Sequence, residues 1–355
     1  MTLDKIINLS LYGRAIAILM IVIFHLFDSI QKVDPSMFHN IIFKMTHFGS
    51  QGIHFFFFSS AFFLYLKYDT ISRYNSLFLS WLGKRLLKLY PTYIASLILI
   101  VIIFYIFNYQ TILPKEILIN LLPMIRNFDD YYIHSINGNF WFLHTLIEFY
   151  LIFPFLVKLS HKLTNLHFLL LTYVIVIIYI TSYTFYFSVD SSSLNPFTAF
   201  FINYLYDFAL GIALAKYFKE NKKIDLKISY LIAIFFIFEI IGVYLSQIGA
   251  YGRNINDIFF SIASIIFILG FSHILTSLLN LIKTKNNYIS LIVNFLTTKV
   301  YDIYLIHHPV IKIVLTQVNI YSPITVFIAF IVIFPIALLN FYITKLITKA
   351  IQWIK

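Results

Sequence analysis

The sequence contains no cysteine, which excludes disulfide bonds, thiolate nucleophiles and metal sites with cysteine ligands. Charged residues are also scarce, at 12% of the 355 residues against roughly 25% in soluble domains. Hydrophobic residues make up 60% of the chain, and the mean hydropathy is +0.86. This composition predicts an integral membrane protein.

Apolar runs of membrane-spanning length recur along the whole chain. They are long and continuous, whereas the strands of a membrane barrel are short and alternate in polarity, so we expect helices. The first run lacks the short apolar core of a cleaved signal peptide and is expected to be retained. We predict an all-α integral membrane protein with about ten transmembrane helices, forming a single domain over residues 1–355 with no appended soluble domain. The expected spans are 10–30, 47–66, 89–108, 140–157, 166–187, 197–216, 228–247, 257–279, 297–317 and 323–344.

Basic residues are distributed unequally between the two sides of this topology. With the N-terminus inside, 20 of the 26 Lys and Arg residues fall on the cytoplasmic side, which predicts that both termini are cytoplasmic. Topology therefore explains most of the net charge of +11, and no nucleic-acid partner is expected; the basic inner face also suits anionic membrane lipids or a phosphorylated donor. The basic residues expected outside are Lys32, Lys44, Lys115, Arg126, Arg253 and Lys312.

Arg14 and His25 lie within the first apolar run, where an arginine near the helix centre costs roughly 2.5–3.5 kcal/mol. Eleven residues at about 100° each place the two side chains within about 20° of each other around a helix, roughly 16 Å apart along its axis. One helix face thus carries a cation near its start and a titratable imidazole further in, which is typical of a functional site. Two alternatives remain open: Arg14 as an interfacial anchor and His25 as an interhelical hydrogen-bonding group.

A basic cluster at Lys84, Arg85 and Lys88 precedes the third expected span. Lys84 and Lys88 are one helical turn apart, so the cluster presents a cationic face on the same side as Arg14, and such a face suits phosphates. The charge bias of membrane topology would also produce this cluster.

The fourth expected span carries Trp141, His144 and Glu148 at intervals of three and four residues, which place them on one helix face. His144 is the nearest sequence partner of Glu148. Because a transporter's proton relay has the same features, this stripe is compatible with both an enzyme and a transporter.

The ninth expected span contains Tyr304, His307, His308 and Pro309. Tyr304 lies about one turn before both histidines, and Pro309 removes a helical hydrogen bond. Adjacent histidines point in different directions, so at most one is expected to face a given cavity. The span has no His-x-x-x-His pair, and no metal is expected.

Together these stretches resemble the acyltransferase-3 family of membrane acyltransferases, which modify cell-envelope glycans and some small molecules. The family's first-span pattern of arginine, ten residues and histidine corresponds to Arg14 and His25. The matches follow the family's order over nearly the whole chain, and imply a membrane O-acyltransferase, expected in a bacterial plasma membrane. The other matching stretches are Gly49 to Phe62; Lys84, Arg85, Lys88, Pro91 and Tyr93; Trp141 through Tyr150, Leu151 and Pro154; and Tyr304, Leu305, His307 and Pro309.

Three positions depart from the family pattern. Ala61 stands where glycine is usual, and Lys88 replaces a typical arginine, which keeps the charge but loses the bidentate fork. Leu146 occupies the position of a frequent glutamate, and Glu148 lies two residues later.

The expected reaction moves an acetyl group from cytoplasmic acetyl-CoA to a hydroxyl of an envelope or exported polysaccharide, or of a lipid-linked glycan. Histidine is the side chain best suited to act as a base near neutral pH, so His25 is expected to be the general base, with Asp28 one turn later orienting it. The other expected site residues are Glu148 and His307 for catalysis; Arg14, Lys84, Arg85 and Lys88 for the phosphates of the donor; and Trp141, His144 and Tyr304 for the acceptor.

The strongest alternative is a transporter or flippase of a lipid-linked glycan. It would use Glu148, Asp207, Glu239 and Asp302 as coupling or substrate-binding groups. Loss of acetyl groups from envelope polysaccharide without the gene favours the enzyme, and accumulation of an unmodified lipid-linked intermediate inside favours the transporter.

Overall fold

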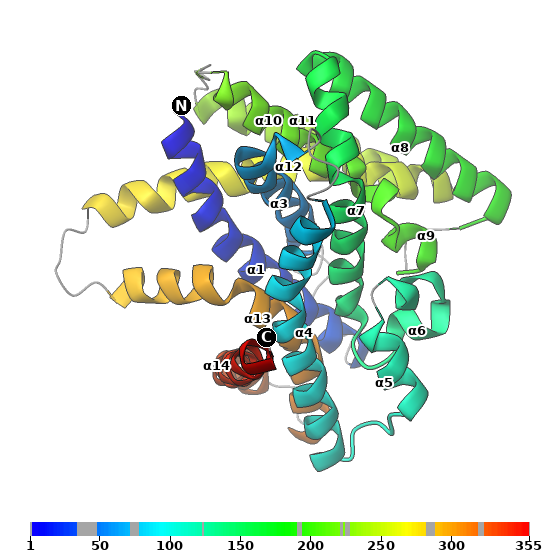
Figure 1. Ribbon diagram of the computed structural model, residues 1–355, viewed down its shortest axis with the longest axis vertical. Coiled ribbons are helices and arrows are strands. Elements are labelled where there is room, and N and C mark those ends of the chain that lie inside the picture. Colours follow the sequence, from blue (N-terminus) through cyan, green and yellow to red (C-terminus); the bar gives the residue numbers. More distant parts are fainter. Residues whose placement is uncertain are drawn as a thin grey trace. The chain divides into compact units, whose positions relative to one another are not determined.

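A computed structural model describes residues 2–33, 48–71, 78–122, 124–189, 194–220, 223, 228–281, 288–318 and 323–354. These residues form helices and short connections and contain no strand, so the all-α prediction is confirmed for them. The longer helices, labelled in Figure 1, are α1 (Leu3–Val33), α3 (Gly52–Tyr68), α4 (Phe78–Ile106), α7 (Trp141–Lys162), α8 (Asn165–Phe187), α10 (Leu205–Lys219), α11 (Ile228–Ser246), α12 (Gly249–Leu281), α13 (Tyr288–Val318) and α14 (Pro323–Ile354).

Among the described residues, seven of these helices are long and apolar enough to cross a membrane: α1, α4, α7, α8, α11, α12 and α14. The other three expected spans fall on α3, α10 and α13. α3 has 17 residues and α10 has 15, fewer than the roughly 20 that a crossing usually needs, whereas α13 carries Lys299, Asp302 and Lys312. The count of ten spans and the cytoplasmic placement of both termini therefore stay predictions. Lys44 lies outside the described residues.

The first helix begins earlier than expected. α1 starts at Leu3, not at residue 10, so Arg14 lies about three turns inside the helix. The helix includes the polar residues that precede the apolar run, whereas hydropathy alone places these residues before the start of the span.

The sixth expected span is broken into short pieces. α9 (Pro196–Ala199) ends at Phe200, whose ψ of 141° is extended, and the 3₁₀ helix η6 (Phe201–Tyr204) then leads into α10. Glu148 explains the second start, because its carboxylate accepts a hydrogen bond from the Phe201 N–H at 2.9 Å and replaces a helical acceptor.

The chain divides into two compact units, each built from three parts of the sequence. The first comprises Met1–Ala17, Gln51–Leu79 and Glu148–Val293, and the second Ile18–Ser50, Ser80–Ile147 and Asn294–Lys355. α1 and α7 contribute residues to both. Each unit is described by itself, and the single-domain organisation stays a prediction.

Small residues allow close helix packing in the first unit. α3 packs against α10 and α12. A Cβ atom on Gly211 of α10 would overlap the backbone oxygen of Phe58 on α3, and one on Gly13 of α1 would overlap the ring of Phe55. Phe149 and Phe208 stack with ring centroids 4.2 Å apart and add an aromatic contact between α7 and α10.

Gly211→Ala is therefore expected to destabilise the protein by about 1–3 kcal/mol, because the added methyl meets rigid backbone and forces α3 and α10 apart. Gly83→Ala is the matched control, since nothing lies within 4 Å of a Cβ at this position in α4, and helix propensity favours alanine. Thermal unfolding of the two purified variants measures the difference. Equal midpoints would contradict the close packing at Gly211.

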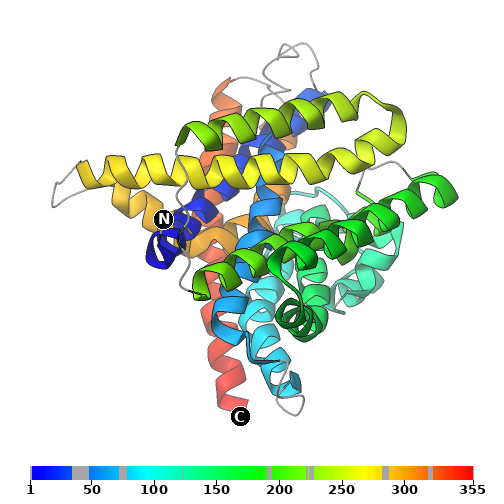
Figure 2. The ribbon, with the colours of Figure 1, turned by 90° about the horizontal axis from the view of Figure 1, so that it is seen from above.

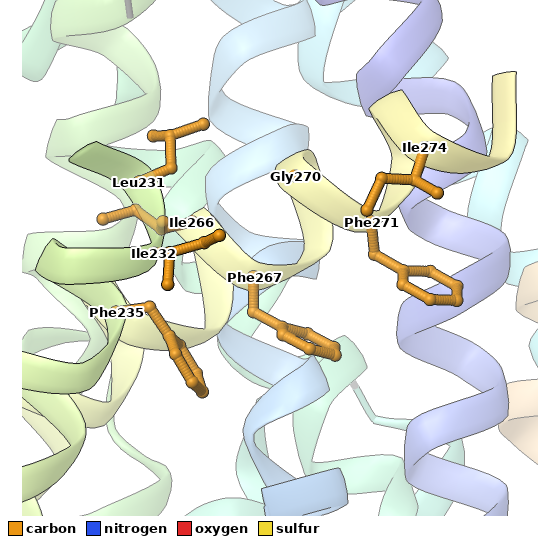
Figure 3. A pocket seen from close by; sticks show the side chains of 8 residues that line it. All are labelled: Leu231, Ile232, Phe235, Ile266, Phe267, Gly270, Phe271 and Ile274. Carbon is orange, nitrogen blue, oxygen red and sulfur yellow. The ribbon is translucent and has the colours of Figure 1, made fainter. Parts of the chain in front are cut away.

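α11 and α12 lie side by side, as Figures 1 and 2 show. An apolar groove of about 170 Å³ runs between them, lined by the rings of Phe235, Phe267 and Phe271 with five aliphatic or glycine neighbours (Figure 3). Most of α11 is exposed. A wholly apolar face of this kind is suited to contact with lipid chains.

The second unit contains long helices together with the connection between α4 and α7. This connection contains α5 (Pro114–Leu121), η4 (Ile125–Phe128), α6 (Asp130–His134) and η5 (Gly138–Phe140). Within the unit, the Gln317 amide of α13 donates to the Phe107 carbonyl at 3.1 Å, and the Asn340 amide of α14 donates to Asp302 of α13 at 2.9 Å.

Candidate functional site

Three histidine rings meet in the second unit. His25 comes from α1, and His307 and His308 come from α13. The centroid of the His25 ring lies 5.1 Å from that of His307 and 4.5 Å from that of His308. We call these three side chains the histidine centre. It brings together three imidazoles, the side-chain type that most often serves as an acid or base in catalysis.

Both adjacent histidines of α13 join this centre, and the expectation that at most one of them faces a given cavity stays a prediction. Their directions differ around the helix, and their own ring centroids are 6.4 Å apart. The ring of His25 packs beside both of them from another helix. His308 is therefore a site residue that the sequence interpretation missed.

The orientation of His307 is fixed by hydrogen bonds at both ring nitrogens. Its Nδ1 lies 2.8 Å from the Tyr304 carbonyl oxygen, and because a carbonyl only accepts, Nδ1 carries the proton. The Asn139 amide nitrogen lies 3.0 Å from Nε2 and donates to it. Both ring nitrogens of His307 therefore have hydrogen-bond partners, which suits His307 to positioning its neighbours.

Pro309 explains why the connection before α7 reaches α13. A proline has no N–H, so the carbonyl of Leu305, four residues earlier, loses its helical donor. The Asn137 side-chain amide donates to this carbonyl at 2.7 Å. The Asn137 side-chain oxygen also accepts from the Asn139 N–H at 3.0 Å, which shapes the turn that presents Asn139 to His307.

His144 belongs to a second buried network in the same unit. Its Nδ1 accepts a hydrogen bond from the Met124 N–H at 2.8 Å, so its proton is on Nε2, which lies 3.3 Å from the Tyr93 hydroxyl. The Tyr93 hydroxyl donates to the Asn120 carbonyl at 2.6 Å. His144 is thus held by the connection between α4 and α7, and its binding of an acceptor stays a prediction.

The remaining expected residues of the second unit are dispersed. Tyr304 is buried, with its ring 5.8 Å from that of His307, and Trp141 is half-buried at the start of α7. Asp28 follows His25 by one turn on α1, and its orienting role stays a prediction. Along the first turns of α4, the three basic side chains are partly or largely exposed: Lys84, Arg85 and Lys88.

Arg14 lies in the first unit and is largely buried. Its Nε donates to the Ser59 hydroxyl of α3 at 3.2 Å, and its guanidinium carbon lies 4.7 Å from the centre of the Phe63 ring. Within the described residues, its terminal nitrogens have no hydrogen bond. Arg14 is therefore held by one nitrogen and one aromatic face and keeps its two NH₂ groups for an anion.

Three carboxylates on the described helices, those of Glu148, Asp207 and Asp302, are already hydrogen-bonded. Asp207 of α10 lies 2.7 Å from Nδ1 of His54 and also accepts from the Ser261 hydroxyl of α12. Glu148 accepts a hydrogen bond from the Phe201 N–H, whereas the sequence suggested His144 as its nearest partner. The catalytic assignment of Glu148 stays a prediction.

These features define a class of protein: a helical membrane protein with apolar spans and three histidine rings in contact. Within the described residues, no group of His, Asp and Glu has the geometry of a metal site. The acyltransferase-3 family model, described as Acyltransferase domain, matches residues 11–342. The chain therefore belongs to this family of acyltransferases and is a multi-pass membrane protein, as the motifs indicated. No curated protein and no solved structure matches the chain.

Proposed function

We propose that the protein transfers an acetyl group from acetyl-CoA to a hydroxyl of an envelope or exported polysaccharide, with His25 as general base. The observation that carries this proposal is the packing of the His25 ring against His307 and His308. Acyl transfer needs a group that removes a proton from the hydroxyl near neutral pH, and imidazole is the side chain best suited to it. Family membership supports the reaction class.

In the proposed step, a neutral His25 accepts the proton of the acceptor hydroxyl while its oxygen attacks the thioester carbonyl. A tetrahedral oxyanion forms, then collapses with cleavage of the carbon–sulfur bond. The coenzyme A thiolate leaves, and the proton held by His25 passes to the thiolate sulfur, either directly or through His308. The products are the acetyl ester and free coenzyme A. His307, held by Asn139 and the Tyr304 carbonyl, positions the other two rings.

The donor is proposed to bind through Arg14, whose terminal nitrogens suit a phosphate. Lys84, Arg85 and Lys88 are likewise proposed to bind phosphate groups, since their side chains are partly or largely exposed on α4. Trp141, His144 and Tyr304 remain the proposed contacts of the acceptor.

Arg14→Ala is expected to raise KM for acetyl-CoA by about 10–100-fold with a smaller change in kcat, because a charge-assisted hydrogen bond contributes roughly 1.5–3 kcal/mol. Initial rates in purified membranes at increasing acetyl-CoA concentration measure the split. Lys158→Ala, which removes an exposed charge from α7, is the control and is expected to leave KM unchanged. A fall in kcat that excess acetyl-CoA does not restore would contradict donor binding.

The function itself is tested by mass spectrometry of surface polysaccharide from cells with and without the gene. The proposal expects loss of the acetyl mass increment in the deletion and its return on complementation. Unchanged acetylation together with an internal lipid-linked intermediate would instead support the transporter. Three of its four acidic residues, Glu148, Asp207 and Asp302, already accept hydrogen bonds within the protein, whereas one side-chain oxygen of Glu239 is buried without a hydrogen-bond partner.

A further inference from the structure

Arg126 is a buried cation on the connection between α4 and α7. Its side chain is 0% exposed, and its Nη2 donates to the carbonyls of Ile133 at 2.5 Å and Asn137 at 3.0 Å. Nε and Nη1 are buried and have no hydrogen-bond partner. Burial lowers the pKa of Arg126 to about 10, so the guanidinium remains charged at neutral pH.

No carboxylate among the described residues neutralises this charge. Within the described residues, Arg126 forms no ion pair, and the carboxylate of Glu116, on neighbouring α5, bonds instead to the Leu113 N–H at 2.6 Å and the Tyr131 hydroxyl at 2.9 Å. Buried charges in proteins are normally paired, because an unpaired one loses its hydration without compensation. The backbone carbonyls of Ile133, Ser135 and Asn137 all contact Nη2, so only one of the three guanidinium nitrogens has hydrogen-bond partners.

Further unsatisfied polar atoms lie in the same connection. The side-chain oxygens of Asn120 and Asn127 are buried without a partner. Asn120 is joined to the surroundings of Arg126 through Ser135, whose hydroxyl accepts from Asn120 at 3.1 Å and whose carbonyl lies 3.4 Å from Nη2. The connection therefore offers N–H donors to an anion and amide oxygens to hydroxyl groups, which is the combination that an acidic sugar requires.

This polar cluster adjoins residues already expected to bind the acceptor. Arg126 interacts electrostatically with Tyr93, His144 and Tyr304. Asn137 connects Arg126 to α13. Its carbonyl accepts from Nη2 of Arg126, and its side-chain amide donates to the Leu305 carbonyl of α13, beside the histidine centre. Arg126 therefore lies in the same unit as the three imidazoles, and the turn at Asn137 connects it to α13 next to His307.

We infer that Arg126 is the binding group for an anionic substituent of the acceptor, a carboxylate or a phosphate, and that Asn120 and Asn127 bind neighbouring hydroxyl groups. This inference rests on the proposed function for the identity of the acceptor. Because the guanidinium is fully buried, the substituent must enter through local opening of the connection. Its helices are short, with eight residues in α5, four in η4 and five in α6, and short elements open locally at low cost.

Thermal unfolding of the full chain in nanodiscs tests binding without any need for activity. The probes are sodium glucuronate, sodium phosphate and glucose, at ionic strength matched with sodium chloride. We expect one anion to raise the unfolding midpoint of the wild type by about 2–4 °C at ten times its Kd, and glucose to leave it unchanged. A rise with glucuronate alone identifies a carboxylate, and a rise with phosphate alone a phosphate.

Arg126→Met is expected to abolish this rise, and Arg126→Lys, which keeps the charge but not the fork, to retain less than half of it. Lys115→Met is the matched control: it removes an exposed positive charge from α5 and is expected to keep the full rise. The absence of an anion-specific rise in the wild type, or an equal rise in Arg126→Met, overturns the inference. If Arg126→Met does not fold, the wild type and Arg126→Lys decide.

A kinetic measurement connects the site to the reaction. With a methyl glucuronoside and a methyl glucoside as acceptors, Arg126→Lys is expected to raise KM about tenfold for the acidic sugar only. An equal change for both acceptors overturns selective recognition. If neither sugar is acetylated by any variant, the proposed function fails while the thermal measurement still decides anion binding.

Discussion

His25→Ala is expected to lower the proposed acetyl transfer by about 10²–10⁴-fold, because the variant lacks the proposed acceptor for the proton of the attacking hydroxyl. The protein continues to accumulate in the membrane, since His25 is one partly exposed side chain of a helix with 31 residues. Acetyl-CoA-dependent labelling of polysaccharide in isolated membranes gives the rate, and immunoblotting gives the amount of protein.

The control for this loss is His167→Ala, which removes an exposed imidazole near the start of α8 and is expected to retain full activity. His308→Ala is expected to reduce the rate less than His25→Ala, because it removes a neighbour of the base. Normal acetylation in His25→Ala, with the protein present at its usual level, would refute the general-base role.

Asp207→Ala destabilises the protein by about 3–5 kcal/mol, since it leaves His54 and Ser261 without their common acceptor in the interior of the first unit. Thermal unfolding in detergent is expected to show a midpoint lower by roughly 5–10 °C. Asp207→Asn retains hydrogen-bonding capacity without the charge and is expected to lie between Asp207→Ala and the wild type.

The double variant His54→Ala, Asp207→Ala is expected to be less destabilised than the sum of the single variants, because they remove the same interaction. Asp69→Asn serves as comparison: the Asp69–Lys219 pair spans 2.8 Å but is partly exposed, and such pairs contribute about 0–1 kcal/mol. Additive effects of His54→Ala and Asp207→Ala would show that the two side chains act independently.

The sequence was most informative where the evidence lay within one helix. Hydropathy located segments that coincide with helical structure, and it did so because lipid-facing helices need long apolar runs. Hydropathy placed the start of α1 too late and did not predict the break in the sixth expected span, because polar groups determine the helix boundaries at both places. Glu148, which holds the Phe201 N–H, lies 53 residues away in the sequence, and no local pattern reveals such a partner.

The candidate site was predictable only where its residues belong to a pattern within one helix. The motifs pointed to His25 and His307, but pairing of His54 with Asp207 joins residues 153 apart, and the bond from Asn137 to Leu305 joins residues 168 apart. Pro309 did indicate that a carbonyl of α13 would need another donor. Arg126 was expected only as an outside charge, because burial and the lack of a counter-ion are properties of the folded connection.

The bond between Asn137 and the Leu305 carbonyl has a consequence for how new specificities evolve. One proline makes the backbone of α13 the docking point of the connection between α4 and α7, and the same turn presents Asn139 to His307. Under the proposed function, substitutions that reshape this connection for a different acceptor also alter the geometry of the imidazoles. Selection for a new acceptor would then act on recognition and turnover together, and the turn at Asn137 is expected to tolerate fewer changes than the residues before it.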